Sequence, residues 1–279
     1  MTRAGVGARL ALQAIFFFAI LGPQYLAIRF GWRLQRWLPV LFHRLFLRLF
    51  GLRIEVRGRP LSDGAVLVLA NHVSWLDISV LGSLTPLSFV AKSEVAGWPV
   101  VGLFARMQRT VFIERGRRTQ TAEVNRRVAQ RLGQGDLIVL FPEGTTSDGN
   151  RVLPFRSALV GAAREALADP ALGSISLQPL AITYVRRNGL PLSRRERPEI
   201  AWYGDMELAP HLAAFLRGGP FDARVTWGEP IPFAAETDRK RAAAEAERAV
   251  RRAFHADAGA ARAAPPAEVA APGRLAAAG

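Results

Sequence analysis

Short apolar segments of the strand-forming type alternate with helix-forming segments between about Leu52 and Phe233. Runs rich in Val, Ile, Leu and Phe, bounded by turn residues, predict the strands Arg53–Val56, Ala65–Ala70, Leu87–Ala91, Thr110–Ile113, Leu137–Phe141, Ser174–Ile182, Ile200–Tyr203 and Arg224–Trp227. Apolar residues at helical spacing predict the helices Leu76–Leu84, Thr119–Leu132 and Ser157–Ala168. Strands that alternate with helices indicate an α/β fold, in which a mostly parallel central sheet is flanked by helices.

The segment after the apolar run Ala65–Ala70 carries four polar side chains within seven positions, at Asn71, His72, Ser74 and Asp77. Histidine is suited to proton transfer near neutral pH, and a carboxylate on its far nitrogen would hold the tautomer. Residues five apart lie about 140° from each other on a helix, so His72 must sit on a loop and Asp77 in the next helical turn. Ser74 and Asp77 also have capping-box spacing. A catalytic pair and a plain helix cap with a turn histidine both remain open.

Polar residues follow the other predicted strands as well. Because ligands gather at the carboxyl ends of parallel strands, we expect these residues to converge on one edge of the sheet. The candidate binding residues are Asn71, Lys92, Arg115, Glu143, Gly144 and Thr145. Each has a plainer alternative, since Lys92 and Arg115 can be solvated and Glu143 and Gly144 can serve a turn.

The charge balance indicates an anionic partner. The chain has 37 Lys and Arg against 23 Asp and Glu, a formal net charge of +14. Nucleic acid, anionic lipid and a phosphorylated substrate all fit this balance, and the apolar N-terminal segment favours lipid. The absence of cysteine excludes disulfides, thiolate metal sites and a cysteine nucleophile. No G-x-S-x-G elbow or phosphate-binding glycine loop occurs, and with four histidines we expect no metal site.

The N-terminal segment Leu10–Ile28 has 19 residues without a formal charge. As a helix of about 28 Å it could cross a bilayer, or Gly22-Pro23 could kink it within one leaflet. A signal peptide is disfavoured because no small-x-small cleavage site follows.

The next segment, Gly31–Phe50, mixes arginine with Trp, Leu and Phe. It predicts a helix, started or kinked by Pro39, that lies at a membrane surface with an arginine stripe toward anionic lipid. The alternative is a helix packed on the domain core with a solvated basic edge. By the positive-inside rule, the arginines after the apolar segment place the rest of the chain on the cytoplasmic side; they are Arg29, Arg33, Arg36, Arg44, Arg48 and Arg53.

We therefore predict four regions. Residues 1–51 form membrane-anchoring or interfacial helices, and residues 52–235 form the α/β domain. Residues 236–257, rich in Ala, Arg and Glu, form a C-terminal helix with Thr237 as the candidate N-cap. Residues 258–279, rich in Ala, Pro and Gly, are expected to be disordered.

Four blocks of this sequence resemble those of the glycerolipid acyltransferase superfamily in order and approximate spacing. They are His72-x4-Asp77 preceded by Asn71, Val111–Arg115, Phe141–Thr145 and Gln178–Ile182. The resemblance spans roughly residues 52–232 and is strongest to the bacterial 1-acylglycerol-3-phosphate acyltransferases. The first and third blocks together are specific, whereas the fourth is weak alone.

The resemblance implies a mechanism and a location. His72 would be the general base for a lysolipid hydroxyl, and Asp77 would orient it. The hydroxyl would attack the thioester of acyl-CoA or acyl-acyl carrier protein directly, giving phosphatidic acid, with no cofactor or metal beyond that co-substrate. Arg115 would hold the acceptor phosphate, and Glu143 and Gly144 would help form the acceptor pocket. The protein would work at the bacterial inner membrane.

Two departures from the family pattern keep alternatives open. Arg109 stands where the second block usually opens with glycine, and Gln178 precedes Pro179 in the fourth block. An extra arginine beside the acceptor site would either tighten the binding of a phosphate or indicate a different headgroup. Relatives with Gln108–Phe112 also include enzymes that acylate lyso-ornithine lipid, whose headgroup carries no phosphate. A non-enzymatic lipid- or nucleic-acid-binding protein would not explain the polar strand ends, and we expect no nucleic acid partner.

Overall fold

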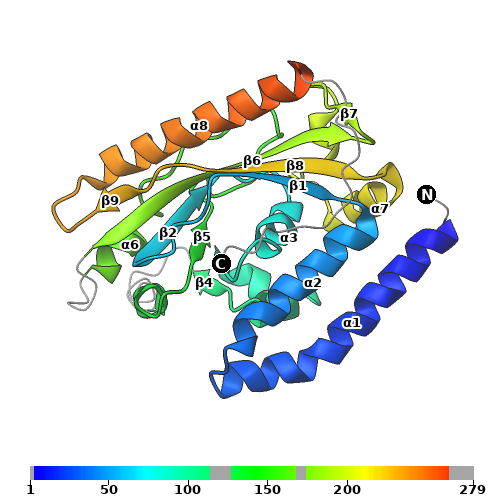
Figure 1. Cartoon of the computed structure of the whole chain (residues 1–279), viewed down its shortest axis with the longest axis horizontal. Coiled ribbons are helices and arrows are strands. Elements are labelled where there is room, and N and C mark those ends of the chain that lie inside the picture. Colours follow the sequence, from blue (N-terminus) through cyan, green and yellow to red (C-terminus); the bar gives the residue numbers. More distant parts are fainter. Residues whose placement is uncertain (1–2, 114–126, 168–173, 264–279) are drawn as a thin grey trace, which may run out of the picture.

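The computed structural model describes residues 3–113, 127–167 and 174–263. An N-terminal helical hairpin of α1 (Arg3–Arg29) and α2 (Leu34–Phe50) packs beside an α/β domain, with α1 on the outside (Figure 1). The described strands of that domain join in one sheet in the order β1-β8-β6-β2-β5-β3-β4, and β7 and β9 pair with β6.

The sheet is mixed but mostly parallel, which confirms the predicted fold class. The strands are β1 (Arg53–Arg57), β2 (Ala65–Ala70), β3 (Ser88–Lys92), β4 (Val111–Ile113), β5 (Ile138–Leu140), β6 (Ile175–Arg187), β7 (Leu190–Pro191), β8 (Phe221–Trp227) and β9 (Ile231–Phe233). The pairs β1–β8, β6–β2, β2–β5, β5–β3 and β3–β4 are parallel. β6 runs antiparallel to β7, β8 and β9.

Helices cover both faces of the sheet. They are α3 (Leu76–Gly82), α4 (Val101–Met107), α6 (Gly161–Ala166), α7 (Leu208–Gly218) and α8 (Arg239–Ala263), with 3-10 turns at Ser93–Gly97 and Arg197–Glu199. In Figure 1, α8 lies along one face, and α2, α3 and α7 lie on the other. Alternate residues of β2 serve the two cores: Val66, Val68 and Ala70 pack toward α2, α3 and α7, and Ala65, Leu67 and Leu69 pack toward α8. Burial on both faces explains why this strand is continuously apolar.

Several element boundaries differ from the sequence predictions. The predicted strand Ile200–Tyr203 is wrong: the N–H groups of Ile200 and Ala201 bond back to the carbonyl of Arg197 in a turn. β6 continues beyond Ile182 because β8 extends the antiparallel ladder as far as Arg187. The helix within Ser157–Ala168 begins only at Gly161. Of Thr119–Leu132, only the helical segment 127–133 is described, and α4 and α7 were not predicted.

The C-terminal helix differs from its prediction at both ends. Asp238, rather than Thr237, is the N-cap, because Asp238 Oδ1 accepts the N–H of Arg241 at 2.8 Å. Thr237 Oγ1 instead accepts the N–H of Ala234. The helix extends to Ala263, so residues 258–263 are helical rather than disordered, and residues 264–279 lie outside the described residues.

Two glutamines in the apolar N-terminal segment connect α1 to its neighbours. Pro39 lies inside α2 and neither starts nor ends it, and proline has no N–H for the carbonyl of Gln35 one turn earlier. Gln24 Nε2 supplies the missing bond at 3.0 Å and also donates to the carbonyl of Met107 at 2.7 Å. Gln13 Nε2 reaches the carbonyl of Phe42 at 3.3 Å. These polar groups hold α1 along α2 and the domain.

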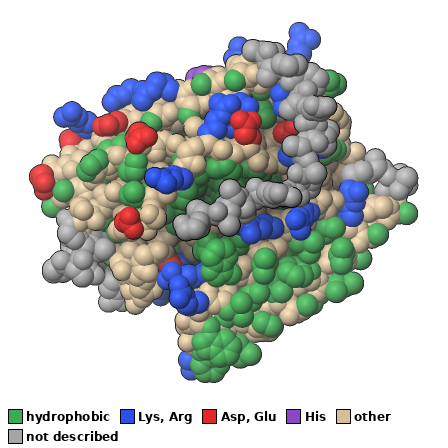
Figure 2. All heavy atoms as spheres, in the orientation of Figure 1, with side chains coloured by type: hydrophobic (Ala, Val, Ile, Leu, Met, Phe, Trp, Pro, Cys, Tyr) green, Lys and Arg blue, Asp and Glu red, His purple; other side chains and the backbone are tan. Residues whose placement is uncertain are grey.

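The outer face of α1 is apolar. Ile15 and Phe18 are 66% and 70% exposed, and Figure 2 shows hydrophobic side chains gathered along α1 and the turn into α2. Within the described part of the chain, α1 is the one helix long and apolar enough to cross a membrane. Since α1 lies along α2 instead of projecting from the domain, this face is suited to contact lipid from the side.

The arginines of α2 do not all face lipid, although the sequence had led us to expect that they would. Arg44 Nε donates to the carbonyl of Ser83 at 2.8 Å, and Arg36 pairs with Asp136 at 3.0 Å. Two of the stripe's members therefore bond to the domain instead of facing lipid. The exposed side chains of this helix are those of Leu34, Trp37, Leu41 and Arg48. The alternative interpretation, a helix packed on the domain core, describes α2 better.

His43 lies buried where α2 packs on the domain, and we expect it to make stability depend on pH. Its Nε2 lies 3.0 Å from Gln108 Oε1. Burial lowers the pKa of His43 to about 4, against 6.5 for a free imidazole. Between these values the unfolded chain binds a proton that the folded chain does not, so stability falls as pH falls from 6.5 to 4. The expected loss is about 3 kcal/mol.

Chemical denaturation of the detergent-solubilised protein at several pH values in this range measures the effect. The His43→Gln variant should lack this contribution, while replacement of the exposed His255 by glutamine should keep it. All other titrating groups are shared, so the difference between wild type and variant isolates His43. Parallel curves for wild type and His43→Gln would rule the effect out.

Candidate active site

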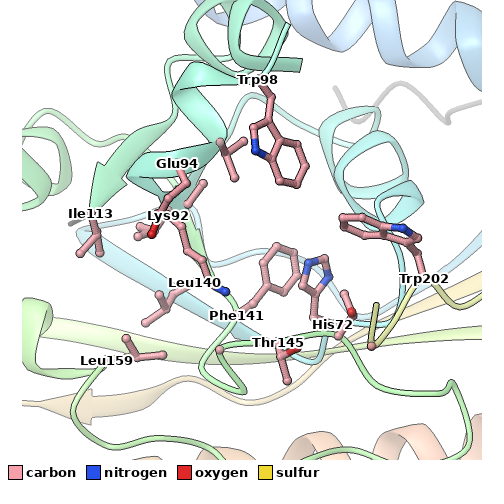
Figure 3. Close-up of a pocket in the computed structure, with 16 residues that line it drawn as sticks. His72, Lys92, Glu94, Trp98, Ile113, Leu140, Phe141, Thr145, Leu159 and Trp202 are labelled. Atoms are coloured by element: carbon pink, nitrogen blue, oxygen red, sulfur yellow. The ribbon is translucent and has the colours of Figure 1, made fainter. Parts of the chain in front are cut away.

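The carboxyl ends of the central strands border a cavity of about 430 Å³. Of the predicted site residues, His72, Lys92, Gly144 and Thr145 line it. Figure 3 shows the side chains of His72, Lys92 and Thr145 around the same space, with Phe141 beside His72. Arg115 lies outside the described residues, so its predicted role stays a prediction.

His72 and Asp77 form the pair that the sequence proposed. His72 sits on the loop after β2, and Asp77 lies in the first turn of α3. His72 Nδ1 is 2.8 Å from Asp77 Oδ2, and the same oxygen accepts the N–H groups of Val73 at 2.7 Å and Ser74 at 3.0 Å. Asp77 is therefore both helix cap and histidine partner. The reciprocal half of the capping box is missing, because Ser74 Oγ has no partner within the described residues.

The buried hydroxyl of Tyr184 completes the surroundings of Asp77. Tyr184 Oη donates to Asp77 Oδ1 at 2.8 Å, so both carboxylate oxygens are engaged. Burial, followed by the charge of Asp77, raises the pKa of Tyr184 well above its usual value. The sequence prediction missed this residue because it ended the strand at Ile182. Only the pairing of β6 with β2 brings Tyr184 next to the loop.

In this geometry one nitrogen of His72 can accept a proton. A carboxylate only accepts hydrogen bonds, so Nδ1 carries the proton and Nε2 presents its lone pair. The imidazole stacks on Phe141 with ring centroids 4.0 Å apart and planes 14° apart. Its side chain is 20% exposed, on the cavity side. An oriented imidazole of this kind can accept a proton from a hydroxyl group bound in the cavity.

Asn71 and Glu143 support the His72 loop and are not among the residues that line the cavity, so their predicted roles in binding substrate stay predictions. Asn71 is fully buried, and its amide donates to the carbonyl of Ile182 at 2.9 Å and accepts the N–H of Ile182 at 2.8 Å. Glu143 is 2% exposed, and its Oε1 accepts the N–H of His72 at 3.1 Å. Burial raises the pKa of Glu143 to about 8, so it is mostly protonated at neutral pH.

Among the lining residues that were not predicted as site residues are Glu94, Trp98 and Trp202. Glu94 and Trp98 follow β3 in and after the 3-10 turn, and Trp202 lies in the segment predicted as a strand. The two indole rings meet edge to face at 6.3 Å. The cavity thus has opposite charges at Lys92 and Glu94 and an aromatic border.

Two residues that depart from the family pattern lie elsewhere. Arg109 precedes β4 and does not line the cavity at His72, so the structure gives no contact between this arginine and that cavity. Gln178 binds the backbone, accepting the N–H of Leu61 at 2.9 Å. In the described ranges, no group of three or more His, Cys, Asp and Glu is placed to hold a metal ion.

Replacing Tyr184 by phenylalanine tests whether its hydroxyl positions the pair. Because a hydrogen bond to a charged group is worth about 1.5 kcal/mol or more, we expect kcat to fall roughly tenfold. KM should stay unchanged, since Tyr184 does not line the cavity. The control is Tyr25→Phe on the exposed face of α1. A change in KM alone, or no change in kcat, would contradict a positioning role.

Comparison with known proteins agrees with this fold and site. The sequence profile of the Acyltransferase family matches residues 53–183. A lyso-ornithine lipid O-acyltransferase of Brucella abortus is 49% identical over 81% of this chain and 84% of its own length. One of Rhizobium meliloti is 45% identical over 74% of this chain and 70% of its own. A 1-acyl-sn-glycerol-3-phosphate acyltransferase of Neisseria gonorrhoeae is 39% identical over 53% of this chain and 54% of its own.

The solved structure of the 1-acyl-sn-glycerophosphate acyltransferase of Thermotoga maritima matches the fold with a TM-score of 0.57. It is 20% identical, and the match covers 90% of this chain and 97% of that one. The fold and the similarity together define a class of enzyme, the acyltransferases of lipid metabolism. The chain belongs to the Acyltransferase family, as its resemblance in sequence predicted. Its apolar hairpin and its lipid-acylating relatives indicate association with a membrane.

Proposed function

We propose that this enzyme transfers a fatty acyl group to the free hydroxyl of lyso-ornithine lipid. The observation that carries this choice of acceptor is the similarity to the Brucella abortus and Rhizobium meliloti relatives, which spans most of both chains. The sequence blocks alone favoured 1-acylglycerol-3-phosphate. The comparisons support the alternative acceptor more strongly.

The charges of the cavity agree with that acceptor. An ornithine headgroup carries both a carboxylate and an ammonium group, whereas a phosphate monoester carries negative charge only. Lys92 and Glu94 line the same cavity and offer one charge of each sign. A zwitterionic headgroup presents one charge of each sign to these two side chains, whereas a phosphate matches Lys92 alone.

The mechanism follows from the His72–Asp77 geometry. His72 Nε2 takes the proton of the acceptor hydroxyl as its oxygen attacks the thioester carbonyl of the acyl donor. Asp77 stabilises the imidazolium that forms, because its Oδ2 lies against the Nδ1–H. The tetrahedral intermediate then expels the thiolate, which receives the proton from His72. The donor is acyl-CoA or acyl-acyl carrier protein, and no further cofactor is required.

A second candidate acceptor is 1-acylglycerol-3-phosphate, giving phosphatidic acid. The similarity to the Neisseria gonorrhoeae enzyme supports it, over about half of each chain. Lys92 in the cavity supports it as well, together with the predicted role of Arg115 in holding a phosphate. In either case we propose that the hairpin of α1 and α2 lies in the cytoplasmic leaflet of the inner membrane, with the α/β domain on the cytoplasmic side.

The test offers each lysolipid separately and in competition to the purified full-length protein in lipid, with a labelled acyl-CoA. We expect transfer to lyso-ornithine lipid to dominate. Exclusive transfer to 1-acylglycerol-3-phosphate would overturn the proposed acceptor and keep the mechanism. Absence of transfer with both acyl-CoA and acyl-acyl carrier protein would overturn the proposal altogether.

A variant adds information about the headgroup. Glu94→Gln should reduce transfer to lyso-ornithine lipid more than transfer to 1-acylglycerol-3-phosphate, because only the former carries an ammonium group. The control is Glu245→Gln, at an exposed position of α8 that does not line the cavity. If Glu94→Gln reduced transfer to both acceptors equally, the argument that Glu94 pairs with the ammonium group would be contradicted.

A further inference from the structure

A second cavity of about 340 Å³ lies at the opposite end of the central strands from His72. It is bordered by the beginning of α2, the start of β3 at Ser88 and the residue before β5, Leu137. It shares no lining residue with the cavity at His72. No step of acyl transfer described above uses it.

Arginines crowd around a single carboxylate at this cavity. Asp136 Oδ1 pairs with Arg36 at 3.0 Å, and Asp136 Oδ2 pairs with Arg131 at 3.0 Å and Arg109 at 2.5 Å. Three guanidinium groups and one carboxylate leave an excess of two positive charges. Arg33 also lines the cavity and adds a further charge. We call Arg36, Arg109, Arg131 and Asp136 the Asp136 cluster.

The cluster lies partly out of water, which makes its excess charge costly. The side chains of Arg109, Arg131 and Asp136 are largely buried. Burial, followed by the charge of Arg109, lowers the pKa of Arg131 from its usual value. A bound anion would offset this repulsion, because interactions between charges are stronger in the protein than in water.

Arg109 reaches the cluster from a strained backbone. Its φ is +61°, in the left-handed region that glycine adopts easily and other residues adopt at a cost. The arginine keeps the strained conformation and directs its guanidinium to Asp136 and the cavity.

The cavity lies beside the surface suited to lipid. Trp37 lines it and is 50% exposed, and the exposed side chains of Phe30, Trp32 and Leu34 belong to the adjoining turn and start of α2. Tryptophan and arginine together are typical of the level at which lipid headgroups meet water. Figure 2 shows the hydrophobic side chains of this hairpin on the same face as several Lys and Arg.

We propose that the Asp136 cluster and its cavity bind the phosphate of an anionic phospholipid headgroup, separately from the acyl acceptor at His72. Guanidinium groups match phosphate oxygens with two parallel hydrogen bonds, and the apolar face of the hairpin would contact the acyl chains. The bound lipid would set the depth and orientation of the α/β domain at the membrane. This inference concerns binding alone and does not rest on the proposed acceptor.

The test is thermal unfolding of the full-length protein in non-ionic detergent, titrated with dihexanoyl-phosphatidylglycerol. Dihexanoyl-phosphatidylcholine, whose headgroup has no net charge, controls for the charge of the lipid. Inorganic phosphate and coenzyme A control for phosphate groups that are not part of a lipid. Phosphatidylglycerol should raise the Tm saturably, and the other three should not. The key variant is Arg109→Gly, which removes the guanidinium and relieves the backbone strain. It should weaken the apparent affinity about tenfold.

The double variant Arg36→Gln/Arg109→Gly should abolish the stabilisation, and Arg252→Gln on the exposed side of α8 should behave as wild type. Equal stabilisation of wild type and Arg109→Gly by phosphatidylglycerol would overturn the proposal and leave the cluster as a brace between α2 and the sheet. An Arg109-dependent rise in Tm with phosphate or coenzyme A would also overturn it, because the ligand would then be soluble.

Discussion

His72→Ala is expected to reduce acyl transfer about a thousandfold or more, since the acceptor hydroxyl then lacks the base that takes its proton. The side chain is partly exposed at the cavity, so its loss leaves no closed void in the core. Both kcat and kcat/KM should fall, with little change in KM, because the lost interaction acts in the transition state.

Initial rates with labelled acyl-CoA and the preferred lysolipid measure this effect. His255→Ala, at an exposed position of α8, is the matched control and should keep the wild-type rate. An unchanged thermal transition for His72→Ala would show that the protein still folds. Substantial activity in such a folded variant would exclude His72 as the base.

Asp77→Asn is expected to be nearly as severe, with a loss of about 10³–10⁴ in kcat. Asparagine has almost the same shape, but it cannot stabilise the imidazolium by charge. The atom that faces His72 Nδ1 also accepts the N–H groups of Val73 and Ser74, so we expect the asparagine oxygen to take that place and the loss to be one of charge. The loss should therefore appear in the chemical step and not in KM.

Asp77→Asn must be separated from a defect in folding, since Asp77 also caps α3. Its Oδ2 accepts the N–H groups of Val73 and Ser74, which a side-chain amide oxygen can still accept. We thus expect a modest shift in Tm beside a large loss of rate. Asp205→Asn, at an exposed site, is the control. Activity that falls only in proportion to folded protein would reduce Asp77 to a helix cap.

The sequence by itself determined the class of fold and proposed the His72–Asp77 pair. The continuous apolar run Ala65–Ala70 can only be a strand buried on both faces, and such strands belong to sheets covered by helices. His72 and Asp77 lie five residues apart across a strand-to-helix turn, so local geometry suffices to bring them together. Lys92, Gly144 and Thr145 could be placed near them because parallel strands end at one edge.

The support behind the reacting pair required the tertiary structure. Tyr184 meets Asp77 from 107 residues away, because β6 lies next to β2 and continues past it. Asn71 and Glu143 look like cavity residues in sequence, yet both turn inward to hold the His72 loop. Sequence position places a residue at a strand end but does not give the direction of its side chain.

The sequence likewise did not give the direction of the arginine side chains or of the polar side chains in the hairpin. Arg36 and Arg109 were expected to meet lipid or the acceptor, but they converge on Asp136 at the far end of the strands. Gln24 lies within the apolar segment Leu10–Ile28, and it donates to the carbonyl of Gln35 that Pro39 leaves unpaired. Local patterns therefore predicted most of the strands and proposed the His72–Asp77 pair. Contacts between segments far apart in the chain decided where the remaining polar groups point, because each buried polar group needs a partner that only the packed fold can bring.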